Sequence, residues 1–351
     1  MKTRVLRRSL VLVALLVTLL LFFALPAILV QGSIRLATPY ILGALAALIA
    51  SRAGVLNLAI DGKMLLGAFL AVVAVYKTGN DPLVGVLVAT ISGGVLGLIF
   101  AILYLRARIN LVILALAVNL FVANATVYFM RVLFGAFGTL ADPSIRSLPV
   151  LSLPVIHAIP LLGERLSGYN AVVYLSWFLV AGVWIMLFRT RFGRHLRAVG
   201  ENREAAETAG INVTLVQVVA LTLSGMLAGL AGSFLSLGVL SQFVENMTAG
   251  RGWIAITVSL FAFEQPVAAF ATSLFFGFSE AISFYLQTNL KLNVPPDLLL
   301  ALPQISTLSA LVLVALRIRA AELLKRRNFA AQFGQELAKL RRGEFVSRQE
   351  L

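Results

Sequence analysis

An all-α, polytopic membrane fold is predicted by three features of this sequence. Hydrophobic residues make up 60% of the 351-residue chain and charged residues only 13%, which is about half of the ~25% usual in soluble domains. The mean hydropathy is +0.95, and the apolar residues are gathered into runs that short polar segments separate. A soluble fold cannot hide that much apolar surface, so we predict about ten transmembrane or partial spans.

The apolar runs follow one another along the whole chain. They fall near residues 9–30, 36–50, 64–76, 83–105, 111–130, 169–188, 215–240, 253–263, 267–287 and 298–316. A bilayer core of ~30 Å needs ~20 helical residues, so most runs are long enough to cross it. The runs at 36–50, 64–76 and 253–263 are shorter, and we interpret them as half-spans, tilted pieces or partly buried segments. We interpret the first run as a retained span, because its apolar core exceeds the roughly 7–15 residues of a signal peptide.

The basic residues predict the orientation of these spans. If ten spans are drawn, 22 of the 29 lysines and arginines fall on the side of the N-terminus, among them Arg52 and Lys63. Such an excess is typical of the cytoplasmic side, so we predict that the N-terminus and the C-terminus both lie inside. The net charge of +14 is then explained by topology and does not call for nucleic acid as a partner.

The residues that carry most enzyme chemistry are scarce. The chain has no cysteine and only two histidines, His157 and His195, which argues against thiol chemistry and metal sites. The one Gly-Lys pair, Gly62–Lys63, is followed by Met64 and is no phosphate-binding loop. We therefore predict no catalytic residue, no metal and no cofactor in this chain.

Two regions interrupt the spans with polar residues beside glycines. The first is GVLNLAIDGKMLLGAF at 54–69 and the second is FVENMTAGRGWIAITVSLFAF at 243–263. Non-helical backbone at membrane depth is tolerated only inside protein or beside water. Broken helices at matching places in two halves point to a transport route. The alternative is that both regions are ordinary loops at the level of the lipid headgroups.

Their placement predicts an inverted repeat and a set of residues that line the route. Under the ten-span topology the two regions open from opposite faces, which gives a permease domain over 1–316 with repeats at 1–165 and 166–316. The residues expected to line the route are Asn57, Asp61, Asn119, Glu245 and Asn246. Glu280 is also placed within a span, where it would either bond a neighbouring helix or face a cavity.

Three other features concern packing and surfaces. The spacings Gly93-x-x-x-Gly97 and Gly225-x-x-x-Gly229 allow close approach of helices. The connection 131–168 holds four prolines, which predicts an irregular outer cap suited to a soluble partner. The tail 317–351 is basic and is interpreted as a cytoplasmic helix on anionic lipid headgroups.

A short polar segment, ENREAAETAGINV at 201–213, lies between two strongly apolar ones. Asn202 is placed to cap a helix over 203–209, and Gly210 to end it in the left-handed conformation. The helix would offer a small smooth face for a groove on another protein, made by Ala205, Ala206 and Ala209. A plain solvated helix is the alternative.

This segment resembles a known motif. Glu204-Ala205-Ala206-x-x-x-Gly210 resembles the cytoplasmic "EAA" loop of ABC-importer permeases, whose short coupling helix docks into an ATPase subunit. The segment 189–213 of the cytoplasmic coupling loop 189–214 resembles the longer version of this loop in the branched-chain amino acid, ribose and nucleoside permease family. The likeness continues through LSGMLAGLAGSFLSLG (223–238), ENMTAGRGWIA (245–255) and NLAIDGKMLLGAF (57–69), and it covers roughly 36–316.

Within that family the chain is most similar to the nucleoside-type permeases, with three departures. Asp61 stands where those relatives usually carry a glutamate, and Leu111 replaces a polar glutamine. FAFEQP at 261–266 replaces a turn of glycine and a basic residue, so that Glu264 reverses the charge there.

The resemblance implies a type II ABC importer-like fold and a permease subunit in the cell membrane that is not itself an enzyme. ATP and Mg would be bound by separate ATPase subunits, an external binding protein would deliver a nucleoside, and a second permease, different or identical, would complete the route. The residues implied in coupling are Asn202, Glu204, Ala205, Ala206 and Gly210. The alternatives are the same machinery carrying ribose or branched-chain amino acids, and an ion-coupled secondary transporter.

Overall fold

The computed structural model describes residues 25–78, 81–151 and 163–289, together with residues 304, 305, 308, 309, 312 and 319. The chain divides into two compact units, residues 1–300 and 301–351. Every element named below belongs to the first unit. The predicted first and last spans and the basic tail lie wholly or largely outside the described residues.

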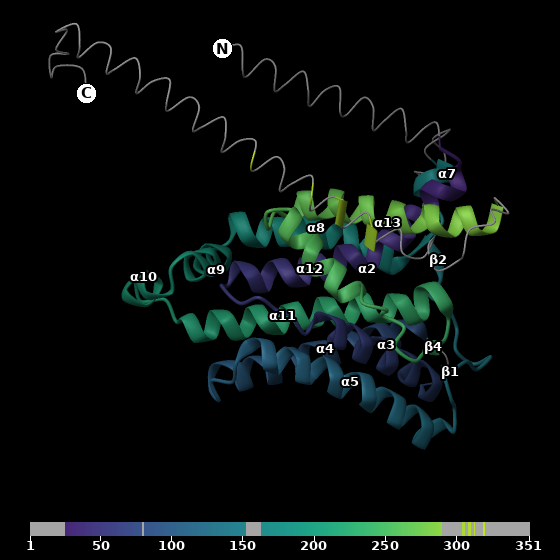
Figure 1. Cartoon of the computed structure of the whole chain (residues 1–351), viewed down its shortest axis with the longest axis horizontal. Coiled ribbons are helices and arrows are strands. Elements are labelled where there is room, and N and C mark those ends of the chain that lie inside the picture. The colour runs from purple at the N-terminus through teal and green to yellow at the C-terminus, as the bar shows by residue number, and fades with distance from the viewer. Residues whose placement is uncertain are drawn as a thin grey trace, which may run out of the picture. The chain divides into compact units, whose positions relative to one another are not determined.

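Helices make up most of the described chain, and this confirms the all-α class (Figure 1). In chain order they are α2 (Ala27–Arg52), α3 (Ile60–Lys77), α4 (Pro82–Leu105), α5 (Leu111–Phe134), α7 (Gly163–Leu166), α8 (Ala171–Arg189), α9 (Arg191–Glu201), α10 (Arg203–Thr208), α11 (Val213–Ser233), the π-helix η1 (Phe234–Leu240), α12 (Arg251–Phe261) and α13 (Pro266–Asn289).

Six helices of the described chain are long and apolar enough to cross a membrane, namely α2, α4, α5, α8, α11 with η1, and α13. α12 has only 11 residues, as the short run at 253–263 predicts. α3 has 18 residues and is buried over most of its length. A multi-pass membrane protein is therefore confirmed, while the count of ten spans stays a prediction.

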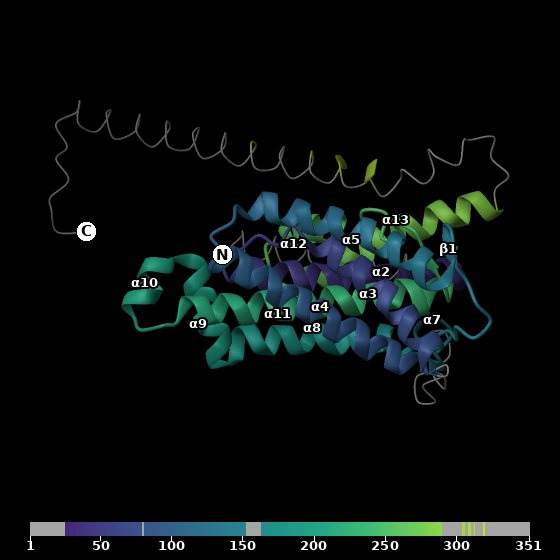
Figure 2. The same ribbon diagram turned by 90° about the horizontal axis from the view of Figure 1, so that it is seen from below.

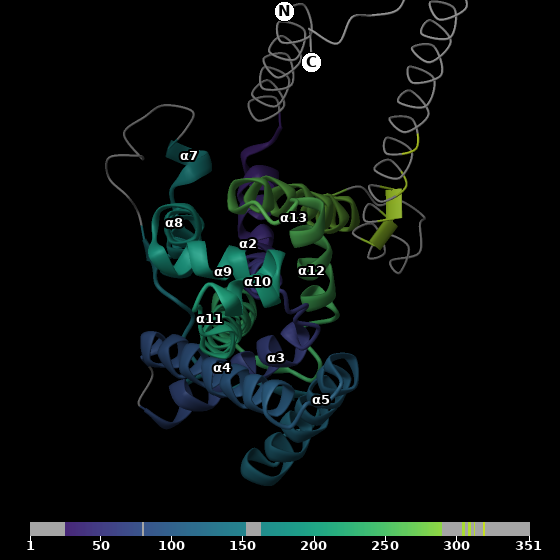
Figure 3. The same ribbon diagram turned by 90° about the vertical axis from the view of Figure 1, so that its left-hand side faces the viewer.

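α2 corrects one interpretation of the sequence. The run at 36–50 predicts a partial span, but α2 is one helix of 26 residues, and 89% of its most apolar window is buried. The prediction is wrong because Gln31 and Arg35 interrupt the apolar run without interrupting the helix. Arg35 donates from Nη2 to the Gly238 carbonyl oxygen of η1 at 2.7 Å, so its charge has a partner inside the protein. α8, α11, α12 and α13 pack around this buried axis (Figure 3).

The two glycine motifs meet where α4 packs on α11, as their spacing predicts. A Cβ added to Gly93 would lie 2.3 Å from the Gly225 carbonyl oxygen, and one added to Gly229 would lie 2.1 Å from the Ala89 carbonyl oxygen. Such distances are too short for any side chain. Packing between backbones is a main source of helix association in membranes, where burial from water contributes nothing.

The irregular connection predicted after α5 is confirmed for its described part. β1 (Thr139–Leu140) pairs antiparallel with β4 (Phe243–Val244), and β2 (Val150–Leu151) pairs antiparallel with β3 (Tyr169–Asn170). These two-residue strands are the exceptions to an all-α reading of the described chain. Residues 152–162, which include Pro154 and Pro160, lie outside the described residues.

The long helices of the first unit run side by side, and their two ends differ. α9 and α10 lie at one end, and β1 and β4 lie at the other, in both of the views that look across the helices (Figures 1 and 2). We call these the α10 end and the sheet end.

The contact between α4 and α11 generates a stability prediction. Gly229→Val should lower the free energy of unfolding by at least ~1–3 kcal/mol, because the added carbons force the two backbones apart. Gly182→Ala on α8 is the matched control, since a Cβ there meets nothing within 4 Å. Thermal unfolding of the purified protein should show a lower Tm for the valine variant only. Equal Tm values would contradict the close contact.

Candidate functional site

The two broken regions meet inside the helical unit. The Asp61 carboxylate accepts a hydrogen bond from the Gly252 backbone N–H at 2.9 Å and another from the Thr248 hydroxyl at 3.1 Å. A Cβ added to Gly252 would lie 2.5 Å from the Asp61 Cα, so only glycine permits this approach. We call this contact the α3–α12 junction.

The junction joins the N-terminal ends of two helices. Asp61 lies in the first turn of α3, and Gly252 is the second residue of α12. Helix N-termini carry a partial positive charge and unsatisfied N–H groups. The Asp61 carboxylate belongs to the first turn of α3 and accepts from an N–H in the first turn of α12, so it joins the two helix ends.

A buried ion pair supports the junction from the side of α13. Arg251, the first residue of α12, donates to the Glu280 carboxylate, and the Tyr40 hydroxyl of α2 donates to the other Glu280 oxygen at 2.8 Å. Glu280 is 5% exposed, so removing Arg251 would leave its charge without compensation. Of the two sequence interpretations of Glu280, the structure supports bonding to neighbouring helices.

Lys63, which is counted in the sequence with the charges of the cytoplasmic side, is buried inside the protein. The side chain is 0% exposed. Its Nζ donates to Asn57 Oδ1 at 3.0 Å and lies 4.3 Å from the centroid of the Phe100 ring. The Asn57 amide donates in turn to the Ser224 hydroxyl at 2.9 Å. An amide oxygen and an aromatic face thus replace water around the ammonium, which the charge count could not anticipate.

Asn119 of α5 holds the segment that leads into α3. Its Oδ1 accepts from the Gly62 N–H at 2.9 Å, and its Nδ2 donates to the Leu58 carbonyl oxygen at 3.0 Å. Three of the residues predicted to line the route, Asn57, Asp61 and Asn119, are therefore gathered around the N-terminus of α3.

The other two predicted route residues lie in the turns before α12. The Glu245 carboxylate accepts from the Gly138 N–H at 3.1 Å and lies 3.6 Å from the Arg131 guanidinium. Asn246 is exposed and has a left-handed backbone with φ of +59°. The structure thus brings Glu245 to the short β1–β4 sheet and not to Asp61.

Sequence reasoning missed three members of the buried network. Arg251, Tyr40 and Lys63 are all buried or nearly buried next to the predicted residues. The signal for Arg251 was available, because an arginine directly before an apolar helix needs a partner at membrane depth. Tyr40 gave no such signal, since tyrosine in an apolar helix is ordinary.

The polar segment at the α10 end has the local structure that its sequence predicts. The Asn202 side chain accepts from the Ala205 N–H at 3.0 Å and begins α10. Gly210 follows the helix with φ of +78°. Glu204, Ala205 and Gly210 are exposed, which leaves them open to a partner.

Ala206 differs from the expected smooth face. It is 3% exposed and packs into the core of its own chain. The alanines exposed to solvent are Ala205 of α10 and Ala209 directly after it, and Ala206 packs the helix against the rest of the chain. This inward position follows from helical spacing, because the side chain of residue 206 points away from that of 204.

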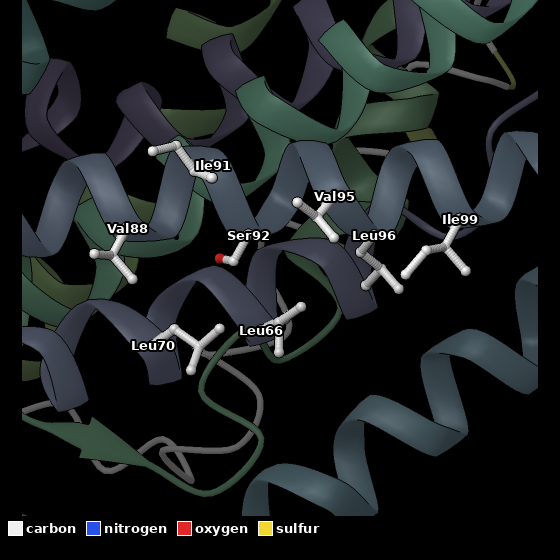
Figure 4. Close-up of a pocket in the computed structure, with 8 residues that line it drawn as sticks. All are labelled: Leu66, Leu70, Val88, Ile91, Ser92, Val95, Leu96 and Ile99. Carbon is white, nitrogen blue, oxygen red and sulfur yellow. The ribbon is translucent and has the colours of Figure 1, made fainter.

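A groove between α3 and α4 lacks the chemistry of a site for a polar solute (Figure 4). It has a volume of about 430 Å³ and is lined by Leu66, Leu70, Val88, Ile91, Ser92, Val95, Leu96 and Ile99. The Ser92 hydroxyl already donates to the Ala89 carbonyl oxygen at 3.0 Å. Buried polar side chains lie elsewhere in the described chain, for example at the α3–α12 junction and around Asn57.

Comparisons with known proteins agree with these features. The family model described as "Branched-chain amino acid transport system / permease component" matches residues 29–316. The guanosine ABC transporter permease NupQ of Bacillus subtilis is 30% identical over 81% of this chain and 91% of its own length. The nucleoside ABC transporter permease NupC of Lactococcus lactis is 30% identical over 73% of this chain and 82% of its own.

A third relative carries a different substrate in its name. TsgC13 of Haloferax volcanii, provisionally named as a glucose ABC transporter permease, is 34% identical over 78% of this chain and 82% of its own. No solved structure matches the chain. The family model covers most of the sequence, including both broken regions and α10. The chain therefore belongs to the branched-chain amino acid transport system / permease component family and is a multi-pass permease of the cell membrane.

Proposed function

We propose that this chain is the permease subunit of an ATP-driven importer that carries nucleosides into the cell. The observation that carries the proposal is the similarity to NupQ over 91% of the length of that guanosine permease. NupC, a nucleoside permease, supports the same substrate class. TsgC13 favours a second candidate, in which the same machinery imports a sugar.

The chemistry of the α3–α12 junction suits a neutral, polar solute. A nucleoside offers sugar hydroxyls and base edges, which amides and a carboxylate can match by hydrogen bonding. In this conformation Asn57, Asp61 and Asn119 bond groups of the chain itself. Separation of α12 from α3 would free the Asp61 carboxylate from the Gly252 N–H, and we propose that it opens the route between them.

Energy for this change would come from partners. We propose that two ATPase subunits bind ATP and Mg, that an external binding protein delivers the nucleoside, and that a second permease, different or identical, completes the assembly. α10 would dock into the ATPase through Glu204, Ala205 and Gly210, which are all exposed. Asn202 would hold the start of the helix, and the buried Ala206 would hold its inner face. ATP drives transport only if the ATPase binds the two conformations with different affinities.

The substrate class is tested by uptake into vesicles that hold the assembled complex. Radiolabelled guanosine and other nucleosides should accumulate when ATP is supplied, and labelled ribose and leucine should not. Uptake of ribose alone would favour the second candidate. Accumulation driven by an ion gradient without nucleotide would contradict an ATP-driven importer of either kind.

The docking role of α10 is tested at Gly210. Gly210→Val should abolish substrate-stimulated ATP hydrolysis while membrane insertion stays intact, because a β-branched residue at φ of +78° costs at least ~1–2 kcal/mol and distorts the end of the helix. A Cβ at this position meets nothing within 4 Å, so no clash contributes. Gly210→Asn, which tolerates the left-handed conformation, is the control and should keep most of the stimulation. Full stimulation in the valine variant would count heavily against docking.

The junction is tested by Asp61→Asn. The amide keeps the shape of the side chain and one acceptor oxygen for the Gly252 N–H, but it removes the negative charge. A hydrogen bond to a charged group is worth ~1.5–3 kcal/mol and a neutral one less, so the weaker junction should lower the initial rate of ATP-driven uptake by about tenfold. Asp142→Asn, in the connection after β1 where the side chain bonds Ser144, should leave the rate unchanged. Equal rates in the two variants would contradict a role for the junction.

A further inference from the structure

Arg52, the last residue of α2, holds the turn that joins α12 to α13. Its guanidinium donates to the carbonyl oxygens of Phe263, at 3.2 Å, and Glu264, at 2.9 and 3.1 Å. It also pairs with the Glu264 carboxylate at 3.2 Å, and the Ser51 hydroxyl donates to the same carboxylate. We call this set of contacts the Arg52–Glu264 clamp.

The clamped turn has an unfavourable backbone conformation. Phe263 and Glu264 have φ of +49° and +54°, and two successive residues with side chains rarely adopt the left-handed region. Such a conformation persists only where surrounding contacts outweigh its cost. Here the contacts come from Arg52 and Ser51, so the shape of the turn depends on where the end of α2 lies.

The backbone of Arg52 is also the place where α9 packs. A Cβ added to Gly200 would lie 2.3 Å from the Arg52 carbonyl oxygen and 3.2 Å from the Gly54 nitrogen. No side chain separates the two backbones, so a shift of α9 displaces Arg52 directly. Gly200 is two residues before Asn202, which caps α10. Only a few residues therefore separate α10 from the contact between α9 and Arg52.

α12 connects the clamped turn to the α3–α12 junction. The helix has 11 residues and is about 16 Å long at ~1.5 Å per residue. Its C-terminal end leads into Phe263 and Glu264, and its N-terminal end carries Arg251 and Gly252. Both ends are thus held by charged contacts, the one to Arg52 and the other to Glu280 and Asp61.

We propose that the Arg52–Glu264 clamp transmits movement of α9 and α10 to the junction, with α12 as the rigid connection. This inference rests on the proposed function, in which an ATPase moves α10. Arg52 and Glu264 are then positioning residues: they touch no solute and act through α12. When α9 shifts the end of α2, the clamp draws the turn with it, and α12 moves against Asp61.

The test is a double-mutant cycle in the assembled transporter with its ATPase partners. The variants are Arg52→Gln, Glu264→Gln and the double variant, which keep polar side chains of similar size. Gln265→Ala is the matched control, because Gln265 lies on the same turn, is exposed and is not part of the clamp. The readout is the ratio of guanosine taken up to ATP hydrolysed, measured beside the Tm and the amount of intact assembly.

Each single variant should lower this ratio about tenfold, the scale of an allosteric coupling free energy, with basal ATP hydrolysis and the amount of intact assembly unchanged. The double variant should be no worse than either single variant, because both changes break one joint. Arg52→Lys keeps the charge but loses the forked geometry and should give an intermediate ratio. This variant replaces Arg52→Gln in the test if the glutamine variant fails to assemble.

Two results would overturn the inference. A ratio equal to that of the wild type in the single variants would show that the clamp transmits nothing. Losses that multiply in the double variant would show that the two residues act separately. Either result leaves the proposed function standing if the wild-type assembly imports guanosine with ATP. A wild-type assembly that consumes ATP without import would overturn the proposed function and this inference together.

Discussion

Polar groups at membrane depth need partners within the protein, because the hydrocarbon offers no hydrogen bonds. The Asp61 carboxylate meets this constraint by accepting bonds from Gly252 and Thr248, and it thereby ties the N-termini of α3 and α12 together. Without that carboxylate, the Gly252 N–H in the first turn of α12 would lie buried without an acceptor. The arrangement of the surrounding helices follows, since Arg251 beside it then requires Glu280, and Glu280 is shared with Tyr40.

Close packing of backbones makes this buried network possible. Gly252 lets α12 reach Asp61, and the glycines of α4 and α11 let those two helices touch along their length. Where backbones touch, small shifts are passed on without being absorbed by flexible side chains. The backbones of Gly200 and Arg52 also touch, and this contact connects the exposed α10 end to the interior of the helical unit.

Several charges of this permease have specific partners in the protein. Two ionic contacts join different elements: Arg52 at the end of α2 pairs with Glu264 in the turn after α12, and Arg251 of α12 pairs with Glu280 of α13. Lys63 has an amide and an aromatic ring in place of a carboxylate. Contacts of this kind contribute little net stability compared with apolar packing, but they define which conformation the short helix α12 adopts between its two ends.

The sequence by itself determined the class of fold, the family resemblance, the glycine contacts and the local structure of α10, because these depend on composition, helical period and capping over a few residues. It also singled out Asn57, Asp61 and Asn119. Only the tertiary structure decided that Lys63 is buried, that Ala206 faces inward, that Glu245 belongs to the sheet end and that α2 is one long helix. The reason is physical: the sequence does not show whether the partner of a charged or small side chain is water or a distant residue, and Arg35 and its partner Gly238 are 203 positions apart.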